Sequence, residues 1–310
     1  VYTYSYDYSS YSRSIDGYDA EGQLTSAIQY VTMEASELPV IYQVTGHGET
    51  ALSGNFTEAI EKANITLSDL TLLKEDAVPE DAAALIINGP MTDFSEDDAN
   101  KVIDYINQSG KVLITCNFQA EELTNFDTIL SACGMSRVSG VVMENDKSYY
   151  YGDTPYYLLP IVKSASYTDS VANSYVFAPY SVGITYGEDT DDVTYTSLLD
   201  TTEKAVSKTD AANATTSAME DGDIAGPFSV AAAYEKSTED DGNAKVVVFG
   251  STEMFTDGAD EVVSKNNSKL FTDTITELTE DSDSATSVIP TKEYTLGAIT
   301  VDAAAGIMSG

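Results

Sequence analysis

Short apolar runs alternate with amphipathic stretches through the first half of the chain. Strands are predicted where a brief run of apolar, β-branched residues ends at a glycine or a polar turn, and helices where apolar residues recur three and four apart. From residue 40 to 115 the predicted order is strand 40–45, helix from Asn55, strand 66–73, strand 82–87, helix from Ser95 and strand 111–115. We therefore predict an α/β fold with a mostly parallel central sheet flanked by helices, amidotransferase-like or flavodoxin-like.

Two of these helices carry signals for their first turn. Asn55 is followed three residues later by Glu58, which predicts a capped start. Ser95 precedes the acidic run 96–98, and acidic side chains are favoured in a first turn because the helix dipole is positive there. Gly110 is expected to end the second helix.

The pattern differs before and after this region. Tyr2, Tyr4, Tyr6 and Tyr8 alternate with other residues, which places four rings on one face of a predicted strand. The chain then turns polar before a helix predicted at 23–31. After a helix at 123–133, residues 136–200 are rich in Tyr, Val, Ser and Asp. The expected segments are strands at 138–143, 174–177 and 193–199, a polar loop at 201–222, strands at 228–234 and 245–249, and a helix at 267–278.

These changes divide the chain into three parts. Residues 1–22 form an N-terminal strand segment, and residues 23–280 form the α/β domain with a β-rich excursion at about 136–240. The strand 245–249 is fully apolar between Lys245 and Gly250 and is expected to rejoin the central sheet. Residues 281–310 begin as an acidic linker and become strand-like. Both ends look cut, so we expect a soluble fragment whose last part leads toward a membrane helix outside this sequence.

Charge and composition narrow the function classes. A formal net charge of −36 arises from 51 acidic and 15 basic residues. Nucleic acid and anionic membrane surfaces are excluded as partners, because both are bound by clustered Lys and Arg. Two cysteines and one histidine are too few for a disulfide scaffold or a histidine-rich zinc site. We predict no cofactor and no metal site.

The best candidate site follows the strand 40–45. His47, the only histidine, lies between Gly46 and Gly48 and beside Glu49. Open α/β sheets bind ligands at the carboxyl ends of their strands, so the residues after the next two apolar strands join it. The glycines either present backbone N–H groups to an anion or simply permit a tight turn, and both interpretations stay open. The candidate ligand-binding residues are Gly46, His47, Gly48, Glu49, Asn88, Gly89, Cys116 and Asn117.

A nucleophilic cysteine is the alternative. Cys116 follows a strand, and the order strand, Asn88-Gly89-Pro90, helix, strand, cysteine is similar to class I glutamine amidotransferase domains. The glycine-flanked elbow of that family is absent, since Asn117 and Phe118 follow the cysteine, and no second histidine is available as a base. A degenerate hydrolase using Cys116 and His47 is therefore the alternative function. We favour a His47 that is hydrogen-bonded within the fold, with Glu49 as its partner.

A third hypothesis uses the tyrosine stripe at the N-terminus. Rings on one face of a strand can stack on sugars or peptides, which would make the chain a carbohydrate-binding or adhesion module. Such stripes more often cover a sheet face or a core, so this is the least favoured of the three functions.

Several segments together resemble the ABC-transporter auxiliary domain family, which includes the gliding-motility-associated substrate-binding-like proteins. The most specific piece is Gly46-His47-Gly48-Glu49, and the similarity spans most of residues 23–290. The matching segments are 23–28, 42–49, 84–90, 110–114, 226–228 and 246–251, with Asn267 in the helix that follows.

This resemblance implies a function that composition does not. The domain would lie outside the cytoplasmic membrane, anchored by flanking membrane helices that this sequence lacks. It would work with an ABC permease and an ATPase encoded alongside, as a non-enzymatic module that binds an unknown small ligand or partner protein. The implied fold is an intraflagellar-transport-like or amidotransferase-like α/β domain, and the family brings no catalytic residues.

Overall fold

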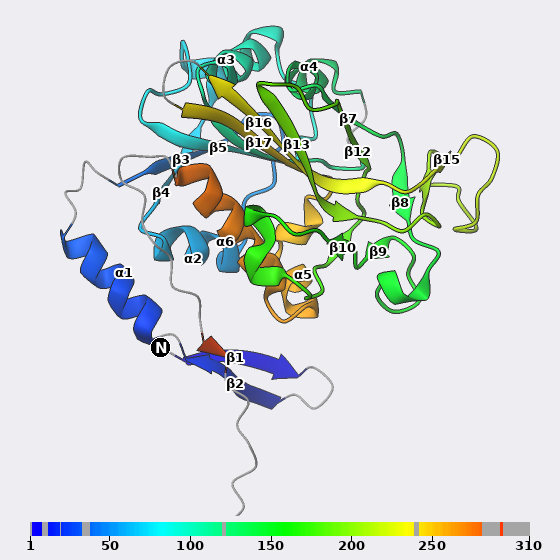
Figure 1. The fold of residues 1–310 in the computed structure, drawn as a ribbon, viewed down its shortest axis with the longest axis horizontal. Coiled ribbons are helices and arrows are strands. Elements are labelled where there is room, and N and C mark those ends of the chain that lie inside the picture. The colour runs from blue at the N-terminus through cyan, green and yellow to red at the C-terminus, as the bar shows by residue number, and fades with distance from the viewer. Residues whose placement is uncertain are drawn as a thin grey trace, which may run out of the picture.

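A parallel sheet forms the centre of the computed structural model, which describes residues 2–7, 12–18, 20–32, 38–119, 122–238, 242–280 and 292–293 (Figure 1). Its parallel strands lie in the order β4-β3-β5-β6-β17. They are β3 (Val40–Val44), β4 (Thr66–Leu70), β5 (Ala82–Asn88), β6 (Lys111–Thr115) and β17 (Gly242–Phe249). The apolar runs predicted the four inner positions of this sheet, and β17 rejoins it beside β6 as expected.

Antiparallel strands extend the same sheet beyond β17. The order continues through β16 and β13 to β10, and β12 pairs with both β16 and β7. Their bounds are β16 (Ser229–Thr238), β13 (Val193–Asp200), β10 (Ile161–Val162), β12 (Ile184–Tyr186) and β7 (Met135–Arg137). The predicted α/β class, with a mostly parallel centre and β-rich additions from the second half, is confirmed.

Helices cover both faces of the sheet (Figure 1). Alternate side chains of β5 point to opposite sides: Ile86 packs in the cluster with Phe56 and Phe271, and Ile87 in the cluster with Val102 and Phe126. The strand is therefore apolar throughout because both of its faces are buried. The helices of the first face are α2 (Gly54–Lys62), α5 (Asp257–Val262) and α6 (Asn266–Thr279), and those of the second are α3 (Glu96–Asn107) and α4 (Thr124–Ala132).

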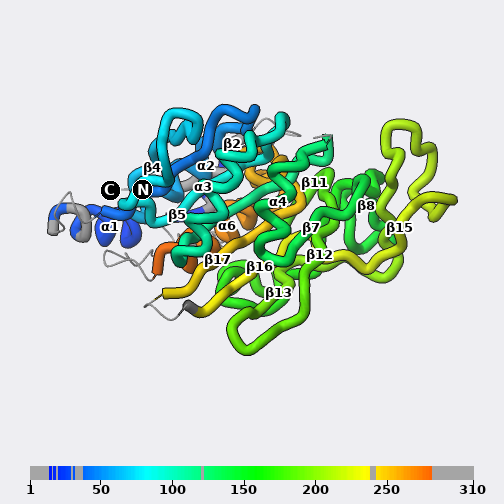
Figure 2. The backbone as a smooth tube through the Cα atoms, turned by 90° about the horizontal axis from the view of Figure 1, so that it is seen from above, coloured from blue at the N-terminus to red at the C-terminus, as the bar shows by residue number. Residues whose placement is uncertain are grey.

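The second half adds two small sheets at one end of the central sheet. One has the order β15-β14-β8, and the other pairs β11 with β9. Figure 2 shows the segment around β15 projecting from the body at the end opposite α1. The strands are β8 (Val141–Met143), β9 (Tyr157–Leu158), β11 (Ala178–Pro179), β14 (Val206–Lys208) and β15 (Ile224–Ala225), and the short 3-10 helices are η2 (Leu72–Lys74), η3 (Lys147–Tyr149), η4 (Ser166–Val171) and η5 (Glu253–Phe255).

The N-terminal segment forms a separate sheet. β1 (Tyr2–Asp7) pairs with β2 (Ser12–Tyr18), which pairs with β18 (Lys292–Glu293). The polar stretch after the tyrosines was not expected to hold β2. Strand β1 includes the first three tyrosines of the predicted stripe, but their ring environments and Tyr8 lie outside the described residues, as do 281–291 and 294–310.

Helix α1 (Ala20–Thr32) confirms the predicted helix 23–31. Its apolar face is open to solvent, since Leu24 and Val31 are 63% and 76% exposed. Ser26 of this helix contacts the body: its hydroxyl donates to Asn64 Oδ1 over 3.1 Å, and the Asn64 amide donates to the Ser26 carbonyl.

Two predicted strands are wrong or too long. Residues 174–177 are irregular, because the Asn267 side chain takes the place of a neighbouring strand: its Oδ1 accepts from the Phe177 N–H, and its amide donates to the Phe177 carbonyl. The strand predicted at 66–73 ends at Leu70, where the chain turns into η2 and buries Leu72.

Two further expectations need correction. Of the strand predicted at 138–143 only β8 (Val141–Met143) forms, because Gly140, which has φ +93° and lies against the Lys208 backbone, interrupts the chain after β7 ends at Arg137. The polar loop expected at 201–222 contains β14, where Lys208 is buried and ion-paired with Glu220 and Asp223. A cationic side chain that finds two carboxylates can be buried, which hydrophobic periodicity does not reveal.

Candidate functional site

The loops after β3 and β5 lie at a switch point of the parallel sheet. Strand β3 is flanked by β4 on one side and β5 on the other, so the connections from the carboxyl ends of β3 and β5 diverge. Crevices of this kind hold the ligands of many open α/β sheets. The sequence therefore placed Gly46–Glu49 and Asn88–Gly89 at the correct edge.

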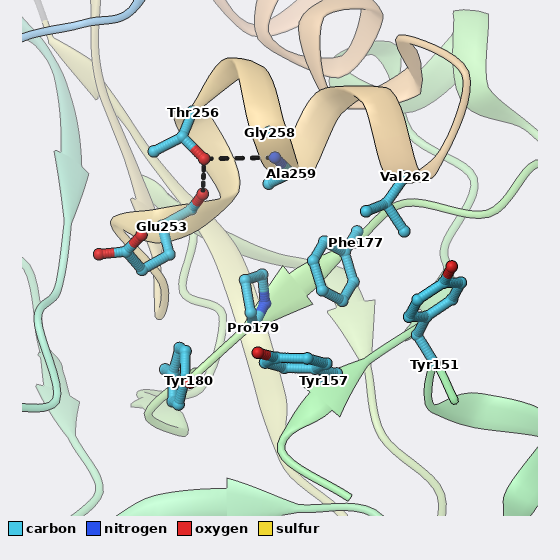
Figure 3. A pocket seen from close by; sticks show the side chains of 10 residues that line it. All are labelled: Tyr151, Tyr157, Phe177, Pro179, Tyr180, Glu253, Thr256, Gly258, Ala259 and Val262. Carbon is cyan, nitrogen blue, oxygen red and sulfur yellow. Dashed lines mark hydrogen bonds between the residues drawn. The ribbon is translucent and has the colours of Figure 1, made fainter. Parts of the chain in front are cut away.

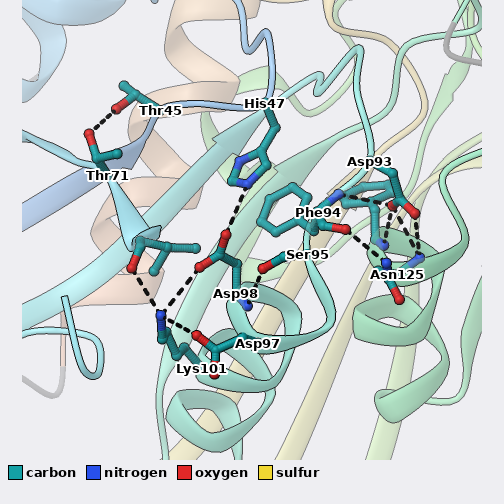
Figure 4. A network of polar contacts seen from close by, with 12 residues as sticks. Thr45, His47, Thr71, Asp93, Phe94, Ser95, Asp97, Asp98, Lys101 and Asn125 are labelled. Atoms are coloured by element: carbon teal, nitrogen blue, oxygen red, sulfur yellow. Dashed lines mark hydrogen bonds and ion pairs between the residues drawn. The ribbon is translucent and has the colours of Figure 1, made fainter. Parts of the chain in front are cut away.

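The crevice is filled by the protein's own side chains. His47 is 8% exposed, and its Nδ1 lies 2.8 Å from Glu49 Oε1 while its Nε2 lies 3.5 Å from Asp98 Oδ2. Its ring stacks on Phe94 with 3.7 Å between ring centroids and 8° between ring planes. Figure 4 shows the imidazole directed at Asp98 beside the Phe94 ring. We call His47, Glu49, Phe94 and Asp98 the histidine clasp.

Backbone contacts tie the two switch-point loops together. The His47 carbonyl accepts the N–H groups of Met91 and Thr92, each over 2.9 Å. Gly48 has φ +77°, and a Cβ there would meet Met91 Cβ at 3.2 Å. Glycine is therefore needed at this position both for its backbone conformation and for the close approach of the neighbouring loop. Of the two interpretations of the glycines, the tight turn accounts for Gly48.

The carboxylates of the clasp decide the charge of His47. Burial alone would lower the pKa of the imidazole, but hydrogen bonds and charges from Glu49 and then Asp98 raise it above the ordinary value of 6.5. Both partner carboxyl groups are buried, with side chains 2% and 5% exposed. A protonated imidazole in this position is an ion-pair partner and has little capacity to act as a general base.

Asp98 connects the clasp to the start of α3. Its N–H donates to Ser95 Oγ over 3.0 Å, which confirms the predicted cap. Its carboxylate also lies 3.3 Å from Lys101 Nζ, which in turn donates to the Leu72 carbonyl and pairs with Asp97. The clasp therefore joins β3, α3 and η2 through buried polar groups, all of which have partners.

Asn88 and Gly89 are likewise held by contacts within the fold. The Asn88 amide donates to the Thr50 carbonyl over 2.6 Å, and its Oδ1 accepts from Thr115 Oγ1 over 2.8 Å. Thr115 Oγ1 also lies 3.1 Å from Thr252 Oγ1. A Cβ at Gly89, where φ is +63°, would lie 2.1 Å from the same Thr252 oxygen. These residues bind strand ends to one another.

Cys116 and Asn117 are separate from the histidine. Cys116 is 1% exposed in the cluster that contains Phe126, and burial raises the pKa of its thiol to about 12. Arg137 and Asp127 are the charges that bear on it. Asn117 Oδ1 accepts the Gln119 N–H over 2.9 Å in a local turn. No hydrogen bond or ion pair joins Cys116 to His47 among the described residues.

The described residues provide neither a cluster of metal ligands nor a helix suited to a membrane. No group of three or more His, Cys, Asp or Glu side chains is placed to hold a metal ion within these ranges. Over the same ranges, none of the helices combines the length and apolar character that a membrane crossing requires.

An open cavity lies at the same edge of the sheet, further along it. It has a volume of about 250 Å³ and is lined by aromatic residues of the β-rich excursion and by η5 and α5. Figure 3 shows Tyr157 flat beneath Phe177 and Pro179, with Tyr180 on one side and Tyr151 on the other. We call this the tyrosine cavity. Its lining includes Tyr151, Tyr157, Phe177, Tyr180, Glu253 and Thr256.

Strand ends position this cavity. Glu253 follows the carboxyl end of β17, and Phe118 follows that of β6 and stacks on Tyr180 with 5.2 Å between ring centroids. Tyr180 has φ +55°, a conformation that non-glycine residues adopt rarely and that concentrates at functional sites. A hydrogen bond that the Tyr180 hydroxyl donates to Tyr157, together with burial, raises the pKa of Tyr180 to about 12, so its hydroxyl is neutral.

Sequence reasoning missed Phe94, Asp98 and the whole tyrosine cavity. Asp98 was assigned to the helix start alone, which is correct but incomplete. The available signal for the cavity was the density of tyrosine in 149–180, where the only element predicted was a strand at 174–177. Aromatic residues beside Gly and Pro in a segment with little strand periodicity would have been a reason to expect exposed rings.

Comparison with known proteins gives a likeness of fold. No protein-family model and no curated protein sequence matches the chain. Among solved structures, the mmIFT52 N-terminal domain aligns with a TM-score of 0.58 at 16% identity, over 77% of this chain and 97% of that one. The fold expected from the sequence, like an intraflagellar-transport domain, therefore agrees with a solved structure.

Two other solved structures align more loosely. PurLQS from Thermotoga maritima has a TM-score of 0.39 at 10% identity, over 78% of this chain and 99% of that chain. The exo-beta-1,4-mannosidase Op5Man5 from Opitutaceae bacterium strain TAV5 has a TM-score of 0.36 at 10% identity, over 79% of this chain and 35% of that chain. At these scores neither alignment bears on the function of this chain.

Proposed function

We propose that the chain is a non-enzymatic binding domain, the auxiliary, substrate-binding-like module of an ABC transport system. In this proposal it lies at the extracytoplasmic face of the membrane, anchored by segments that flank the sequence, and contacts the permease and ATPase of that system. The ligand is a small molecule or a partner protein. Nothing in the proposal requires the domain to carry out chemistry.

The observation that carries this proposal is the contrast between the buried side chains of His47 and Cys116 and the open tyrosine cavity beside them. His47 is paired with two buried carboxylates, and Cys116 is a buried thiol whose pKa is about 12. Groups held in this way lack the free base and the thiolate that covalent catalysis needs. The neighbouring tyrosine cavity, in contrast, is open and lined by side chains suited to binding.

The assignment to a transport system rests on the sequence resemblance. Its most specific piece, Gly46-His47-Gly48-Glu49, is the loop that forms the histidine clasp. The resemblance brings a binding role and no catalytic residues, which is compatible with the buried state of His47 and Cys116. The strong negative charge also suits a domain that approaches neither nucleic acid nor the anionic membrane surface.

Sidedness can be tested by cysteine labelling of the full-length protein in intact cells. Leu73 is 79% exposed, so a Leu73→Cys variant offers an accessible thiol, whereas Cys116 and Cys133 are buried and serve as an internal control. We expect a membrane-impermeant maleimide to label the variant and to leave the parent protein unlabelled. Labelling that requires cell lysis would overturn the extracytoplasmic assignment.

The partner assignment needs a second experiment. An affinity tag on the full-length protein, with cross-linking before detergent extraction, is expected to recover the permease and ATPase encoded beside it. An unrelated membrane-anchored domain carrying the same tag is the control. Recovery of neither subunit above that control would contradict the transport role.

A further inference from the structure

The rings of the tyrosine cavity stand at steep angles to one another. Tyr157 is inclined 80° to Phe177 and 89° to Tyr180, with centroid separations of 5.4 Å and 5.6 Å. Tyr151 closes the other side against Phe177 at 65°. Rings of this kind present π faces in more than one direction around a shared space (Figure 3). An object held there lies against the rings of Tyr157 and Phe177, which are inclined in two directions.

The charge of the lining favours a cation. Among the ten described residues around the cavity none is Lys or Arg, and one, Glu253, is a carboxylate. Its charge is near enough to act on Tyr180. The formal net charge of −36 adds a field that draws cations to the surface. An anionic ligand would find no cationic side chain here.

The lining also lacks the groups that read a sugar. No Asn or Gln is present among those ten residues, and the Thr256 hydroxyl is already engaged with the Glu253 carbonyl and the Ala259 N–H. The remaining polar groups are tyrosine hydroxyls and one carboxylate. Aromatic faces with a single acidic group match an organic cation better than a polyhydroxylated ring.

The cavity is small and its rings are held in place. A volume of about 250 Å³ lies just below the roughly 300–1,000 Å³ of typical ligand pockets, which suits a head group rather than a large molecule. Tyr180 is held between Phe118 and Tyr156, with centroid separations of 5.2 Å and 4.9 Å. This stacking fixes a ring whose backbone conformation is itself unfavourable, so little ordering remains to be done on binding.

We propose that the tyrosine cavity binds a methylated or quaternary ammonium group, held by cation–π contacts with Tyr157 and Phe177 and by the charge of Glu253, while the stacked Tyr180 forms a fixed wall of the site. This inference deepens the proposed binding function and rests on it. The same group occurs in free choline-like solutes and in phosphatidylcholine head groups, and both share the chemistry that the cavity recognises.

The test uses choline and its neutral isostere 3,3-dimethyl-1-butanol, titrated into the protein at constant ionic strength and followed by NMR chemical shifts of the tyrosine rings. We expect choline to bind at least about tenfold more tightly than the alcohol, since the two differ in charge but hardly in shape. Equal binding of both compounds, or no binding of choline, would overturn the proposal.

Variants locate the site. Tyr157→Leu removes a ring and Glu253→Gln removes the charge, and each is expected to weaken choline binding by about tenfold. Tyr175→Leu is the matched control, because Tyr175 is 61% exposed and outside the cavity. Glu253 is an exposed side chain, so its variant tests the cavity even if Tyr157→Leu does not fold. If the affinity for choline is unchanged in both single variants, Glu253→Gln and Tyr157→Leu, choline binds outside this cavity.

Two arms separate the sources of the group and the two proposals. If the protein sediments with phosphatidylcholine vesicles and free choline reverses this, the ligand is the lipid head group. If the protein binds choline but does not sediment with the vesicles, the ligand is a free solute. Either result supports the cavity as the binding site. If choline fails while the tagged protein still recovers the permease and ATPase, the cation inference is wrong and the transport role stands. If choline binds but the tagged protein recovers neither the permease nor the ATPase, the transport role is wrong and the cation inference stands.

Discussion

The single histidine acts as a buried cation that joins two parts of the chain. Glu49 comes from its own loop and Asp98 from the first turn of α3. Without the imidazolium the buried Glu49 carboxylate would lose its ion-pair partner and Asp98 would keep only Lys101, which is a costly arrangement for buried charges. The Phe94 ring adds a stacking surface for the charged ring. The loop therefore owes its composition to the fold, and its position at the switch point does not make it a ligand site.

Replacing His47 tests this role through stability. His47→Gln keeps a hydrogen-bonding side chain but removes the positive charge, so we expect a loss of about 3 kcal/mol in the free energy of unfolding at pH 6. Urea denaturation followed by circular dichroism measures it. Lys147→Gln is the control, since Lys147 is 78% exposed in its pair with Asp153 and its loss is expected to cost at most about 0.5 kcal/mol.

The pH dependence of the same pair of proteins has a definite sign. The pKa of folded His47 lies above the ordinary value of 6.5, so its ion-pair contribution is fully present below pH 6.5 and is lost as pH rises through the folded pKa. The stability difference between the parent protein and His47→Gln should therefore shrink above neutral pH. A difference that stays constant from pH 6 to pH 9 would show that the lost interaction was packing and not charge.

At the scale of the elements, the N-terminus of helix α2 is capped by a residue that is distant in sequence. Ser53 is its N-terminal capping position but makes no side-chain cap. The Asp257 carboxylate, at the start of α5, accepts instead from Ser53 Oγ over 2.7 Å and from the Asn55 N–H over 2.9 Å. Asn55 was predicted to be the cap and is corrected here: its side chain donates to Asp260 Oδ2. Two helices far apart in sequence thus share one polar junction.

Asp257→Ala should lower the free energy of unfolding by about 1–2 kcal/mol, because it removes both the cap and a negative charge at the positive end of α2. Urea denaturation measures the loss, and Asp153→Ala, which removes a 95% exposed carboxylate, is the control. The loss of stability in the double variant Asp257→Ala/Ser53→Ala should be smaller than the sum of the losses in the two single variants, because both substitutions remove the same contact. Strict additivity would contradict a shared junction.

The elements themselves were largely predictable, for a physical reason. A strand buried on both faces must be apolar throughout, and a helix on a sheet needs a stripe of apolar residues, so β3, β5, β6, β17, α3, α4 and α6 were all visible in the sequence. Failures occurred where a side chain from elsewhere replaced a backbone partner. Asn267 at Phe177 and Asp257 at Asn55 are such cases, each bridging segments that no local pattern connects.

At the scale of the whole molecule, topology was predictable but the content of the site was not. The order of strands and helices placed the loops after β3 and β5 at one edge, and they lie there. What fills that edge depends on three-dimensional neighbours: Asp98 and Phe94 close the crevice at His47. The tyrosine cavity draws on residues from 151 to 262 and so has no local motif.

The net charge is also a property of the whole molecule. With 51 acidic residues against 15 Lys and Arg and one His, at least 35 carboxylates cannot have a one-to-one cationic partner. The cations with several acidic neighbours, such as Lys208 with Glu220 and Asp223, act locally and leave most of this excess in place. Like charges spread over a compact fold repel one another, and unfolding relieves that repulsion.

Salt should therefore stabilise the protein. Raising the ionic strength from about 0.1 M to 1 M shortens the screening length from about 10 Å to 3 Å. We expect the midpoint of thermal unfolding at pH 7 to rise by about 5 °C or more, on the order of 3 kcal/mol for a chain of this size. Circular dichroism in NaCl and in KCl measures it, and equal shifts in the two salts would attribute the effect to screening.

The same titration near the isoelectric point supplies the control for this prediction. At a pH close to the sequence pI of about 4.1 most of the excess charge is neutralised, so the rise with NaCl should largely vanish. A salt effect of equal size at both pH values would have to come from strengthened apolar burial, because that contribution does not depend on the charge of the carboxylates. A midpoint at pH 7 that stays level or falls as NaCl is added would show that repulsion among the carboxylates does not limit the stability of this fold.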